Sequence, residues 1–497
     1  MNAVLKQDGS VAGRFQRMAA KAPELAQTSA AQRADKIRKL LDATLAARPA
    51  ILAAVRKELR CHDNDIDGQL VMIKAEAECA IRYVADWMKP EVVDPSMMTL
   101  GKHSYIRHEP KGLVLHVSTW NAPIAEAFVP AIGAIAAGCP FALKPSELAP
   151  HCAKVLAEIV AQVFPDDEFA VFEGGAEVAT ELLRQPFNHI FYIGGHSVGR
   201  LIMKAAAEHF ATVTLEMGGK NPAIVHRSAD LDDAAQKIGW GRIANAGQVC
   251  VAPDYVLVDE PVLRPFIEAL GRRMTAMYNP QGKGFDQSPE FARIVNARHF
   301  QRVKALFDDA LAKGAKLEFG GEFKEADLFI GPAILSNVRP DMKIMQDEIF
   351  APLICVLPFA RREDIVAELR RHLKPLSSYV FARDREFIDW AIAHTTSGNT
   401  VINHNLVQSG TNTALPFGGV NASGMGRLGG RATFLECSNP RSVVEDGKGI
   451  GDASMMFPPY GPKYRQALDW MLKTRMKTYP PVLRAMNRLV RAFAKNP

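Results

Sequence analysis

Residues 189–199 read His-Ile-Phe-Tyr-Ile-Gly-Gly-His-Ser-Val-Gly, and this stretch indicates how the chain folds. Its first five residues are an apolar run of the length of a buried strand, which opens directly into Gly194. The residues that follow, Arg200 to His209, favour a helix. Glycines at such a junction allow a tight turn, and the N-terminus of the helix attracts an anion. The stretch therefore predicts one strand–turn–helix unit of a parallel sheet.

The glycine turn alone does not identify a ligand. It is neither a Gly-x-Gly-x-x-Gly fingerprint nor a P-loop, because no Gly-Lys-Ser/Thr sequence follows it. Two interpretations of Gly194, Gly195 and Gly199 stay open at this point. They form either one side of a phosphate site or only a tight turn between a strand and a helix.

The same alternation extends on both sides of this stretch. The neighbouring runs of strand length are Gly112–Ser118, Phe141–Lys144, Ala170–Glu173 and Thr212–Leu215. Residues with helical spacing separate them, both after Ala122 and from Val155 to Phe164. Strands that alternate with helices predict a parallel, doubly wound sheet.

A second α/β region begins near Met217. Its predicted strands are Asn221–Val225 and Asp254–Val258, and its predicted helices are Leu231–Ala246, Pro261–Met277 and Ala292–Gly314. Outside both regions we expect a hairpin over Val92–Arg107 and a late edge strand over Ser442–Glu445. The late strand would pair either with the early hairpin or with another subunit.

Charge and cysteine usage exclude some classes of protein. The net charge is +6, but nine Lys or Arg and one acid between residues 454 and 497 give that tail +8, so the remaining chain carries −2. Basicity confined to the tail argues against nucleic-acid binding. Seven scattered cysteines without a Cys-x-x-Cys pair argue against a zinc ribbon and favour a reducing, cytoplasmic location. The N-terminus lacks the apolar core of a secretory signal, so we expect no export.

The uncharged stretch from Ala127 to Leu143 approaches the length of a membrane span. It contains two prolines and two glycines and is rich in alanine. We therefore expect a buried helix followed by a buried strand rather than a span.

Four side chains could carry chemistry, although each is ordinary by itself. Lys144 and Glu147 follow a predicted strand, where open parallel sheets bind ligands, and they could hold a ribose or simply be solvated. Cys250 lies among apolar neighbours, where a lone cysteine is more often an inert core residue. Glu216 ends a predicted strand and could be a general base or a turn partner.

In combination, the segments resemble the aldehyde dehydrogenase superfamily in order and spacing. The matching stretches are Thr119–Pro123, Leu143–Glu147, Gly194–Gly199, Thr214–Lys220, Asn245–Cys250, Asp347–Pro352 and Leu415–Gly419. The resemblance covers roughly residues 28–445. It implies a Rossmann-like cofactor domain, an α/β catalytic domain and a small β element for oligomerisation. We therefore expect a cofactor domain over 1–90 and 110–217, a catalytic domain over 218–415, bridging strands over 91–109 and 430–447, and a basic tail over 448–497.

The resemblance also implies a role for each matching residue. Cys250 would be the nucleophile, Glu216 the general base, and Asn121 an oxyanion-hole donor together with the backbone N–H of Cys250. The cofactor NAD, with NADP as an alternative, would be bound by Lys144 and Glu147 at the adenosine ribose, by Gly194, Gly195 and Gly199 near the pyrophosphate, and by Glu348 and Phe350 near the nicotinamide. No metal is expected.

These roles imply oxidation of an aldehyde to its acid. A Cys250 thiolate adds to the carbonyl, the thiohemiacetal transfers hydride to the nicotinamide, and Glu216 activates water to hydrolyse the thioester. The alternatives are a CoA-acylating dehydrogenase, against which Glu216 argues, and a non-catalytic relative, against which Cys250 argues. Pocket residues do not reveal which aldehyde is oxidised.

The chain resembles most the class 3 branch, with its fatty-aldehyde and coniferyl aldehyde dehydrogenases. The resemblance to this branch rests on the run from Gln248 to Tyr255 and on Phe457-Pro-Pro-Tyr460. The branch implies a homodimer and aromatic or medium- to long-chain aliphatic substrates, and Glu147 should disfavour the 2′-phosphate of NADP. Two positions depart from the common pattern: Gly195 replaces Ser or Asn, and Asn421 replaces a glycine.

The tail is the last element with a predicted role. Its apolar residues Val482, Leu483, Met486 and Leu489 have helical spacing, and basic residues occupy other faces. Such a helix could pack on a subunit or the substrate entrance, or contact an anionic membrane peripherally.

Overall fold

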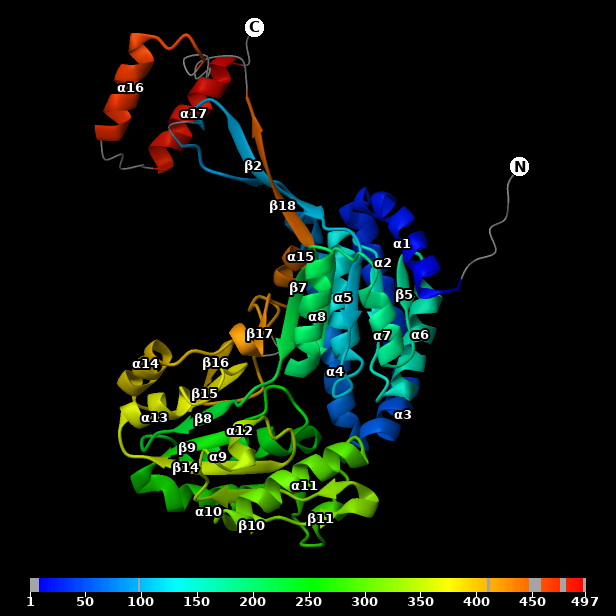
Figure 1. Ribbon diagram of the computed structural model, residues 1–497, viewed down its shortest axis with the longest axis vertical. Helices are drawn as coiled ribbons and strands as arrows, with labels where there is room; N and C mark the ends of the chain where they lie inside the picture. The colour runs from blue at the N-terminus through cyan, green and yellow to red at the C-terminus, as the bar shows by residue number, and fades with distance from the viewer. Residues whose placement is uncertain (1–8, 97–98, 409–411, 447–456, 474–479, 495–497) are drawn as a thin grey trace. The chain divides into compact units, whose positions relative to one another are not determined.

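The computed structural model describes residues 9–96, 99–408, 412–446, 457–473 and 480–494. Its contacts divide the chain into two units, one of residues 1–84 and 111–437 and the other of residues 85–110 and 438–497. Both large sheets lie in the first unit (Figure 1). The domain boundaries expected from the sequence stay a prediction.

The first sheet has six strands in the order β17-β7-β6-β3-β4-β5. Their bounds are β3 Val114–Val117, β4 Phe141–Lys144, β5 Phe169–Val171, β6 His189–Gly194, β7 Thr212–Met217 and β17 Gly424–Met425. β3 to β7 are parallel, as the alternation of strands and helices predicts, and β17 returns antiparallel beside β7. The parallel strands therefore end at one edge of the sheet, where α/β proteins bind ligands.

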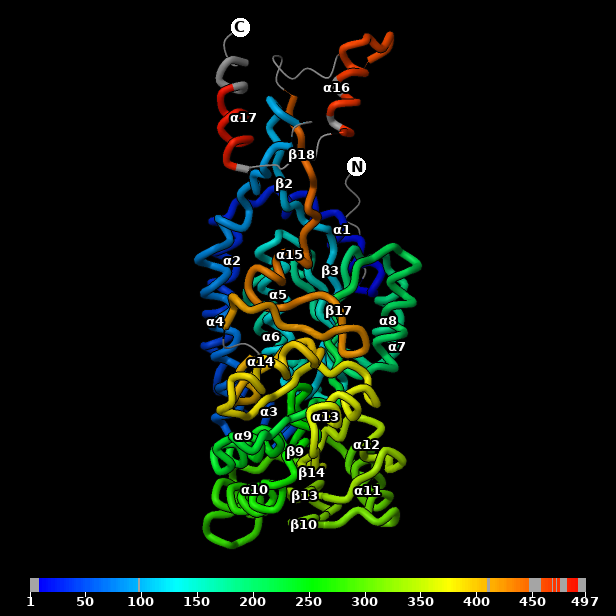
Figure 2. Tube along the Cα trace, turned by 90° about the vertical axis from the view of Figure 1, so that its left-hand side faces the viewer, coloured from blue at the N-terminus to red at the C-terminus, as the bar shows by residue number. Residues whose placement is uncertain are grey.

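Helices cover both faces of this sheet, as the continuous burial of its strands requires. The helices of this region are α1 Val11–Ala26, α2 Ala30–Ala46, α3 Arg48–Leu59, α4 Asp63–Trp87, α5 Ala125–Ala137, α6 Pro150–Val163, α7 Ala176–Leu183, α8 His196–Glu208 and α15 Arg431–Glu436. Figure 2 shows α2 and α4 on one side of the sheet and α7 and α8 on the other.

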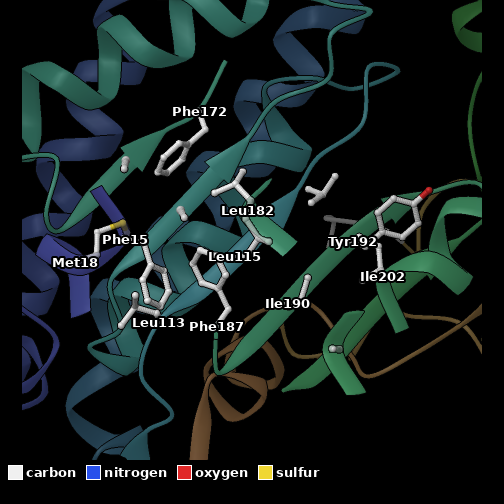
Figure 3. Close-up of a cluster of buried hydrophobic side chains, with 14 of the residues drawn as sticks. Phe15, Met18, Leu113, Leu115, Phe172, Leu182, Phe187, Ile190, Tyr192 and Ile202 are labelled. Atoms are coloured by element: carbon white, nitrogen blue, oxygen red, sulfur yellow. The ribbon is translucent and has the colours of Figure 1, made fainter. Parts of the chain in front are cut away.

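The core between the sheet and α1, α7 and α8 is drawn in Figure 3. Phe15 of α1 packs edge-on against Phe187, with ring centroids 5.1 Å apart. Leu115 and Ile190 project from neighbouring strands into the same cluster, because alternate residues of a strand share a face. This buried layer fixes the strands whose ends form the candidate site.

The uncharged stretch from Ala127 to Leu143 folds as its prolines and glycines predict. It forms helix α5 and strand β4, and nearly all its residues are buried. Gly138 ends the helix in a left-handed conformation with φ 85°, which glycine adopts at no steric cost. Within the described parts of the chain, no helix combines the length and the apolar character needed to cross a membrane.

The second sheet has seven strands in the order β10-β13-β14-β9-β8-β15-β16. Their bounds are β8 Pro222–Val225, β9 Tyr255–Asp259, β10 Lys316–Gly320, β13 Ala333–Ser336, β14 Leu353–Phe359, β15 Ser377–Phe381 and β16 Asn399–Ile402. The associated helices are α9 Leu231–Ile243, α10 Leu263–Tyr278, α11 Ala297–Ala312, α12 Lys343–Gln346, α13 Arg362–Leu369 and α14 Arg385–His394. β11 Phe323–Lys324 and β12 Phe329–Ile330 form a separate short ladder.

Two helices of this region are shorter than predicted. α9 ends at Ile243 rather than Ala246, because Asn245 and Ala246 adopt left-handed φ angles of 49° and 52°. α11 starts at Ala297 rather than Ala292, where the Asn296 side chain caps the helix by accepting from the His299 N–H.

The second unit contains the sheet β1 Glu91–Val92, β2 His103–Pro110 and β18 Ser438–Glu445. β1 pairs antiparallel with β2, as the predicted hairpin requires. The late strand pairs along its whole length with β2, from Ser438 opposite Pro110 to Glu445 opposite His103. Of the two predicted pairings, the structure therefore shows the one with the early hairpin. The described tail forms α16 Pro462–Lys473 and α17 Pro480–Ala494.

Candidate active site

Glu216 lies near the carboxyl end of β7, the strand that β17 and β6 flank. Its side chain is 3% exposed, and its Oε1 atom has no hydrogen-bond partner. Burial raises the pKa of Glu216, although a hydrogen bond with the Cys250 thiol opposes this shift. A buried carboxyl with a raised pKa is suited to accept a proton near neutral pH.

Cys250 lies on the loop that follows the left-handed residues Asn245 and Ala246. Its carbonyl oxygen accepts a hydrogen bond of 2.7 Å from the Asn221 side chain, which also donates to the carbonyl of Ala252. Arg242, almost fully buried, donates to the carbonyl of Gly247 at 2.8 Å and to that of Pro253 at 2.9 Å. The loop is therefore held on both sides of the cysteine.

The electrostatic surroundings of the Cys250 thiol favour its neutral form. Burial and the nearby carboxyl of Glu216 raise its pKa well above the usual value. The thiolate is the nucleophilic form, so a base has to take the proton before attack. Glu216, hydrogen-bonded to the thiol, is placed to do so.

Asn121 lies in the turn between β3 and α5. Thr119 donates to its Oδ1 atom at 3.0 Å, and its own Nδ2 donates to the carbonyl of Gln248 at 3.0 Å. Asn245 in turn donates to the carbonyl of Asn121 at 3.0 Å. The structure thus brings Asn121, Glu216 and Cys250, which are far apart in the sequence, into one site.

Lys144 and Glu147 lie at the end of β4, on the same edge of the first sheet. The Lys144 ammonium is buried and donates to the Glu147 carboxylate at 2.6 Å, while about half of the Glu147 side chain is exposed. Partial burial raises the pKa of Glu147, but the hydrogen bond and charge of Lys144, together with a backbone hydrogen bond, outweigh it, so that the net shift of the pKa is downward. The Glu147 carboxylate therefore remains charged at this edge.

The glycine turn after β6 leaves space for a ligand at one position. A side chain at Gly199 would collide with Met217 Sδ at 2.5 Å, whereas nothing lies within 4 Å of a Cβ placed on Gly195. Gly195 is the N-cap residue of α8, and no side chain caps this end of the helix, so the space beside Gly195 lies next to the helix N-terminus. This open helix terminus fits the pyrophosphate of a dinucleotide.

Glu348 and Phe350 belong to the loop before β14. A Cβ on Gly218 would lie 2.3 Å from a carboxylate oxygen of Glu348, so the carboxyl lies directly over this glycine. Burial raises the pKa of Glu348 to about 8. Phe350, with a left-handed φ of 53°, packs edge-on against Trp120 at 5.6 Å. Glu348 is thus next to the strand end that carries Glu216, and Phe350 is next to the turn that carries Asn121.

Two residues of the site were missed by the sequence analysis. Glu126, in the first turn of α5, contributes to the raised pKa of the Cys250 thiol, and its own pKa is raised to about 8 by burial and by the charge of Glu216. It is the only charged residue of Ala125–Ala137, and this isolation was a signal that could have revealed it. Gln248, also missed, is buried and accepts from the Val295 N–H at 3.0 Å.

Comparisons with known proteins identify the family and the fold of the chain. The family model described as "Aldehyde dehydrogenase family" matches residues 6–443. The curated relatives include "Aldehyde dehydrogenase family 3 member A2" of Mus musculus, 36% identical over 82% of this chain and 83% of its own length. They also include "Aldehyde dehydrogenase, dimeric NADP-preferring" of Canis lupus familiaris, 36% identical over 88% of this chain and 93% of its own length. The solved structure of the substrate-bound state of Staphylococcus aureus AldH covers 93% of this chain and 100% of that one, with 33% identity and a TM-score of 0.88.

The chain belongs to the aldehyde dehydrogenase family. It is an NAD(P)-dependent oxidoreductase that oxidises aldehydes, and its relatives include class 3 members, as the sequence motifs predict. The predicted fold class is confirmed as well.

Proposed function

We propose that Cys250 is the nucleophile, Glu216 the general base and Asn121 the oxyanion-hole donor of this aldehyde dehydrogenase. The observation that supports these roles most directly is that the Asn121 amide and the buried Glu216 carboxyl converge on the cysteine loop, where the carboxyl is close enough to the Cys250 thiol to raise its pKa. A cysteine with a purely structural role needs no carboxyl beside its thiol to act as a base.

In this proposal, each residue acts on a stated atom. Glu216 takes the thiol proton, and Cys250 Sγ then forms a bond to the aldehyde carbon. The second hydrogen of Asn121 Nδ2, which Gln248 does not use, donates to the oxygen that becomes negative. NAD(P), when bound, accepts the hydride that leaves the same carbon. Glu216, once it has released the first proton to solvent, accepts a proton from water, whose oxygen attacks the thioester carbon; the C–S bond then breaks, Cys250 Sγ regains a proton and the acid is released.

The cofactor residues are proposed on the same edge of the sheet. Lys144 and Glu147 would hold the adenosine ribose, and the open turn at Gly194, Gly195 and Gly199 would lie beside the pyrophosphate. Glu348 would bind the nicotinamide ribose, with Phe350 packing near the ring. The charged, half-exposed Glu147 favours NAD over the doubly anionic 2′-phosphate of NADP.

Substrate and assembly are also proposals. The class 3 relatives support aromatic or medium- to long-chain aliphatic aldehydes, and the word "dimeric" in the name of the canine relative supports a homodimer. Helix α17 packs on its own unit, where Arg484 pairs with Asp94 at 2.7 Å and Asn487 accepts from the Gly101 N–H at 2.7 Å. This docking favours packing on protein over peripheral membrane contact for the tail. A free-acid product is favoured over an acyl-CoA, because the base Glu216 is present.

Two variants with different expected kinetics test these roles. Cys250→Ser should form no reduced cofactor above background. Glu216→Gln should form the acyl-enzyme slowly, because the thiol has lost its base, and should then retain it, because water has lost its base as well; mass spectrometry of the intact protein detects it as a substrate-dependent mass increase. Cys79→Ser, at a half-buried cysteine outside the site, is the matched control and should keep native turnover. Rapid steady-state turnover by Cys250→Ser or by Glu216→Gln would overturn the assigned roles.

A further inference from the structure

The peptide that joins Glu348 to Ile349 is held from two sides by side chains of distant segments. Arg302 of helix α11 donates from Nη1 to the carbonyl oxygen of Glu348 at 3.1 Å and from Nη2 to that of Ile349 at 2.6 Å. The N–H of Ile349 donates to Asp254 Oδ1 at 3.0 Å. The C=O and N–H of a trans peptide point in opposite directions, so Arg302 and Asp254 form a clamp around this peptide.

Asp254 connects one side of the clamp to the loop of the nucleophile. It belongs to the same loop as Cys250, and its side chain is 1% exposed. The carboxylate also accepts from Arg242 at 3.2 Å and from Lys220. Moving it would leave buried charges without their partners, which is costly. The Ile349 N–H is therefore fixed relative to the cysteine loop.

Arg302 supplies the other side of the clamp from helix α11, which is anchored in the core by Phe300 and Val303. A guanidinium presents its donors in a planar fork, so one side chain can bind two successive carbonyl oxygens. Phe350, directly after the clamped peptide, has a left-handed φ of 53°. Such a strained conformation persists only where surrounding contacts impose it, and it is typical of functional sites.

The clamped peptide carries the carboxyl that would bind the nicotinamide ribose. A Cβ on Gly218 would meet the two oxygens of this Glu348 carboxyl at 2.3 and 2.4 Å. Gly218 directly follows β7, the strand that carries Glu216. A shift of the peptide would therefore move the proposed ribose ligand relative to both the base and Cys250.

We propose that Arg302 is a positioning residue for hydride transfer. With Asp254 it fixes the Glu348–Ile349 peptide, and this sets the distance between the nicotinamide and the aldehyde carbon on Cys250. The inference rests on the proposed roles of Glu348 and Cys250. Hydride transfer requires the two carbons to be close and aligned, and a misplacement of about 1 Å can slow a reaction by about 100-fold.

Two reactions of the same protein separate positioning from folding. The first is oxidation of benzaldehyde or decanal with NAD, followed as NADH formed in the first turnover after rapid mixing. The second is hydrolysis of 4-nitrophenyl acetate without cofactor. Here Cys250 Sγ bonds to the ester carbon, the C–O bond breaks and 4-nitrophenolate leaves; water then cleaves the thioester to acetate, and the thiol regains its proton. The ratio of the two rates cancels any loss of active enzyme by misfolding.

Arg302→Met removes the guanidinium and leaves the contacts of Asp254 in place. It should lower the first-turnover rate of NADH formation by about 100-fold. Ester hydrolysis should change by less than about threefold, because the cysteine loop keeps its anchor. The Kd for NAD, from isothermal titration without aldehyde, should rise by about tenfold or less, because Lys144 and Glu147 still hold the adenosine end.

Two further variants of the same helix calibrate this result. Arg302→Lys retains the charge and can bind the carbonyls only without the fork, so its rate of NADH formation should lie between those of the native protein and Arg302→Met. Arg298→Met makes the same chemical change at an exposed position of α11 and should be native in all three measurements.

The outcomes distinguish this inference from the proposed function. An equal loss of oxidation and ester hydrolysis in Arg302→Met would show a merely structural role and overturn the inference. Unchanged oxidation would overturn it as well, and so would a Kd for NAD that rises as much as the oxidation rate falls. Absence of both reactions in the native protein would instead overturn the proposed roles of Cys250 and Glu216.

Discussion

The side-chain amide of Asn121 donates to the carbonyl oxygen of Gln248, two residues before Cys250, at 3.0 Å. The Thr119 hydroxyl donates to the other end of the same amide, which fixes its orientation, so that Nδ2 is directed toward the cysteine loop. One of the two Nδ2 hydrogens is used by Gln248. The other remains for an oxyanion, and the donor needs no reorganisation during the reaction.

Asn121→Ala should therefore lower kcat/KM by about 100- to 1,000-fold, which is the usual cost of losing one oxyanion-hole donor. Steady-state reduction of NAD with a good aldehyde substrate measures this loss. Thr119→Val, which removes only the hydrogen bond that orients the amide, is the graded control and should have a smaller effect. A loss below about threefold in Asn121→Ala would exclude the oxyanion role.

Glu147→Gln should increase the use of NADP. The substitution removes the negative charge that would face a 2′-phosphate, while the amide can still accept from Lys144 and from a ribose hydroxyl. We expect the KM for NADP to fall by about tenfold and that for NAD to change by less than about threefold. Lys144→Ala is the contrasting variant and should weaken both cofactors. An unchanged ratio of the two KM values would show that Glu147 is not near the 2′ position.

The five parallel strands of the first sheet were predictable because their signal is local, whereas β17 was not predicted. An apolar run such as His189–Ile193 is buried on both faces, so its composition alone indicates a strand, and the following glycines mark its end. The ends of α9 and α11 were less predictable. They depend on left-handed angles at Asn245 and Ala246 and on the cap at Asn296, which compete with continued helical periodicity.

A residue of the candidate site could be predicted from the sequence only where a recognisable motif surrounds it. Cys250 and Glu216 belong to such motifs, although neither one alone distinguishes a catalytic residue from an inert one. Glu126 has no motif, and its importance depends on the packing of α5 against the strand end that carries Glu216. Such a distance between elements is not encoded in the spacing of the residues along the chain.

Gly218→Ala should weaken cofactor binding with little loss of stability. The added Cβ would lie 2.3 Å from the Glu348 carboxylate, which is the far end of a side chain and can move away. If Glu348 binds the nicotinamide ribose, its displacement should raise the KM for NAD by about tenfold. Gly219→Ala is the matched control, because its Cβ would meet the backbone of Pro375 and Leu376 at ordinary contact distances of 3.4 and 3.5 Å. Equal KM values for the two variants would contradict the role of Glu348.

At alkaline pH, the Glu76→Gln variant should be more stable than the native protein. Burial raises the pKa of Glu76 to about 7 from a usual value of 4.5. Between these two values the folded chain holds a proton that the unfolded chain has lost, so the contribution of Glu76 to stability falls as the pH rises. Above about pH 7 the loss is complete, with an upper limit of about 3 kcal/mol. Glutamine has no proton to lose, and its oxygen still accepts from the Gly430 N–H.

The difference in melting temperature between Glu76→Gln and the native protein should therefore be near zero at pH 5 and clearly positive at pH 8. Other titrating groups are common to both proteins and cancel in this difference. Glu78→Gln, at an exposed position of the same helix α4, should show the same small difference at both pH values. The contradicting outcome is a melting-temperature difference between Glu76→Gln and the native protein that is the same at pH 5 and at pH 8. The Glu76 carboxyl would then titrate alike in the folded and unfolded states, and its burial beside Gly430 would carry no cost in free energy.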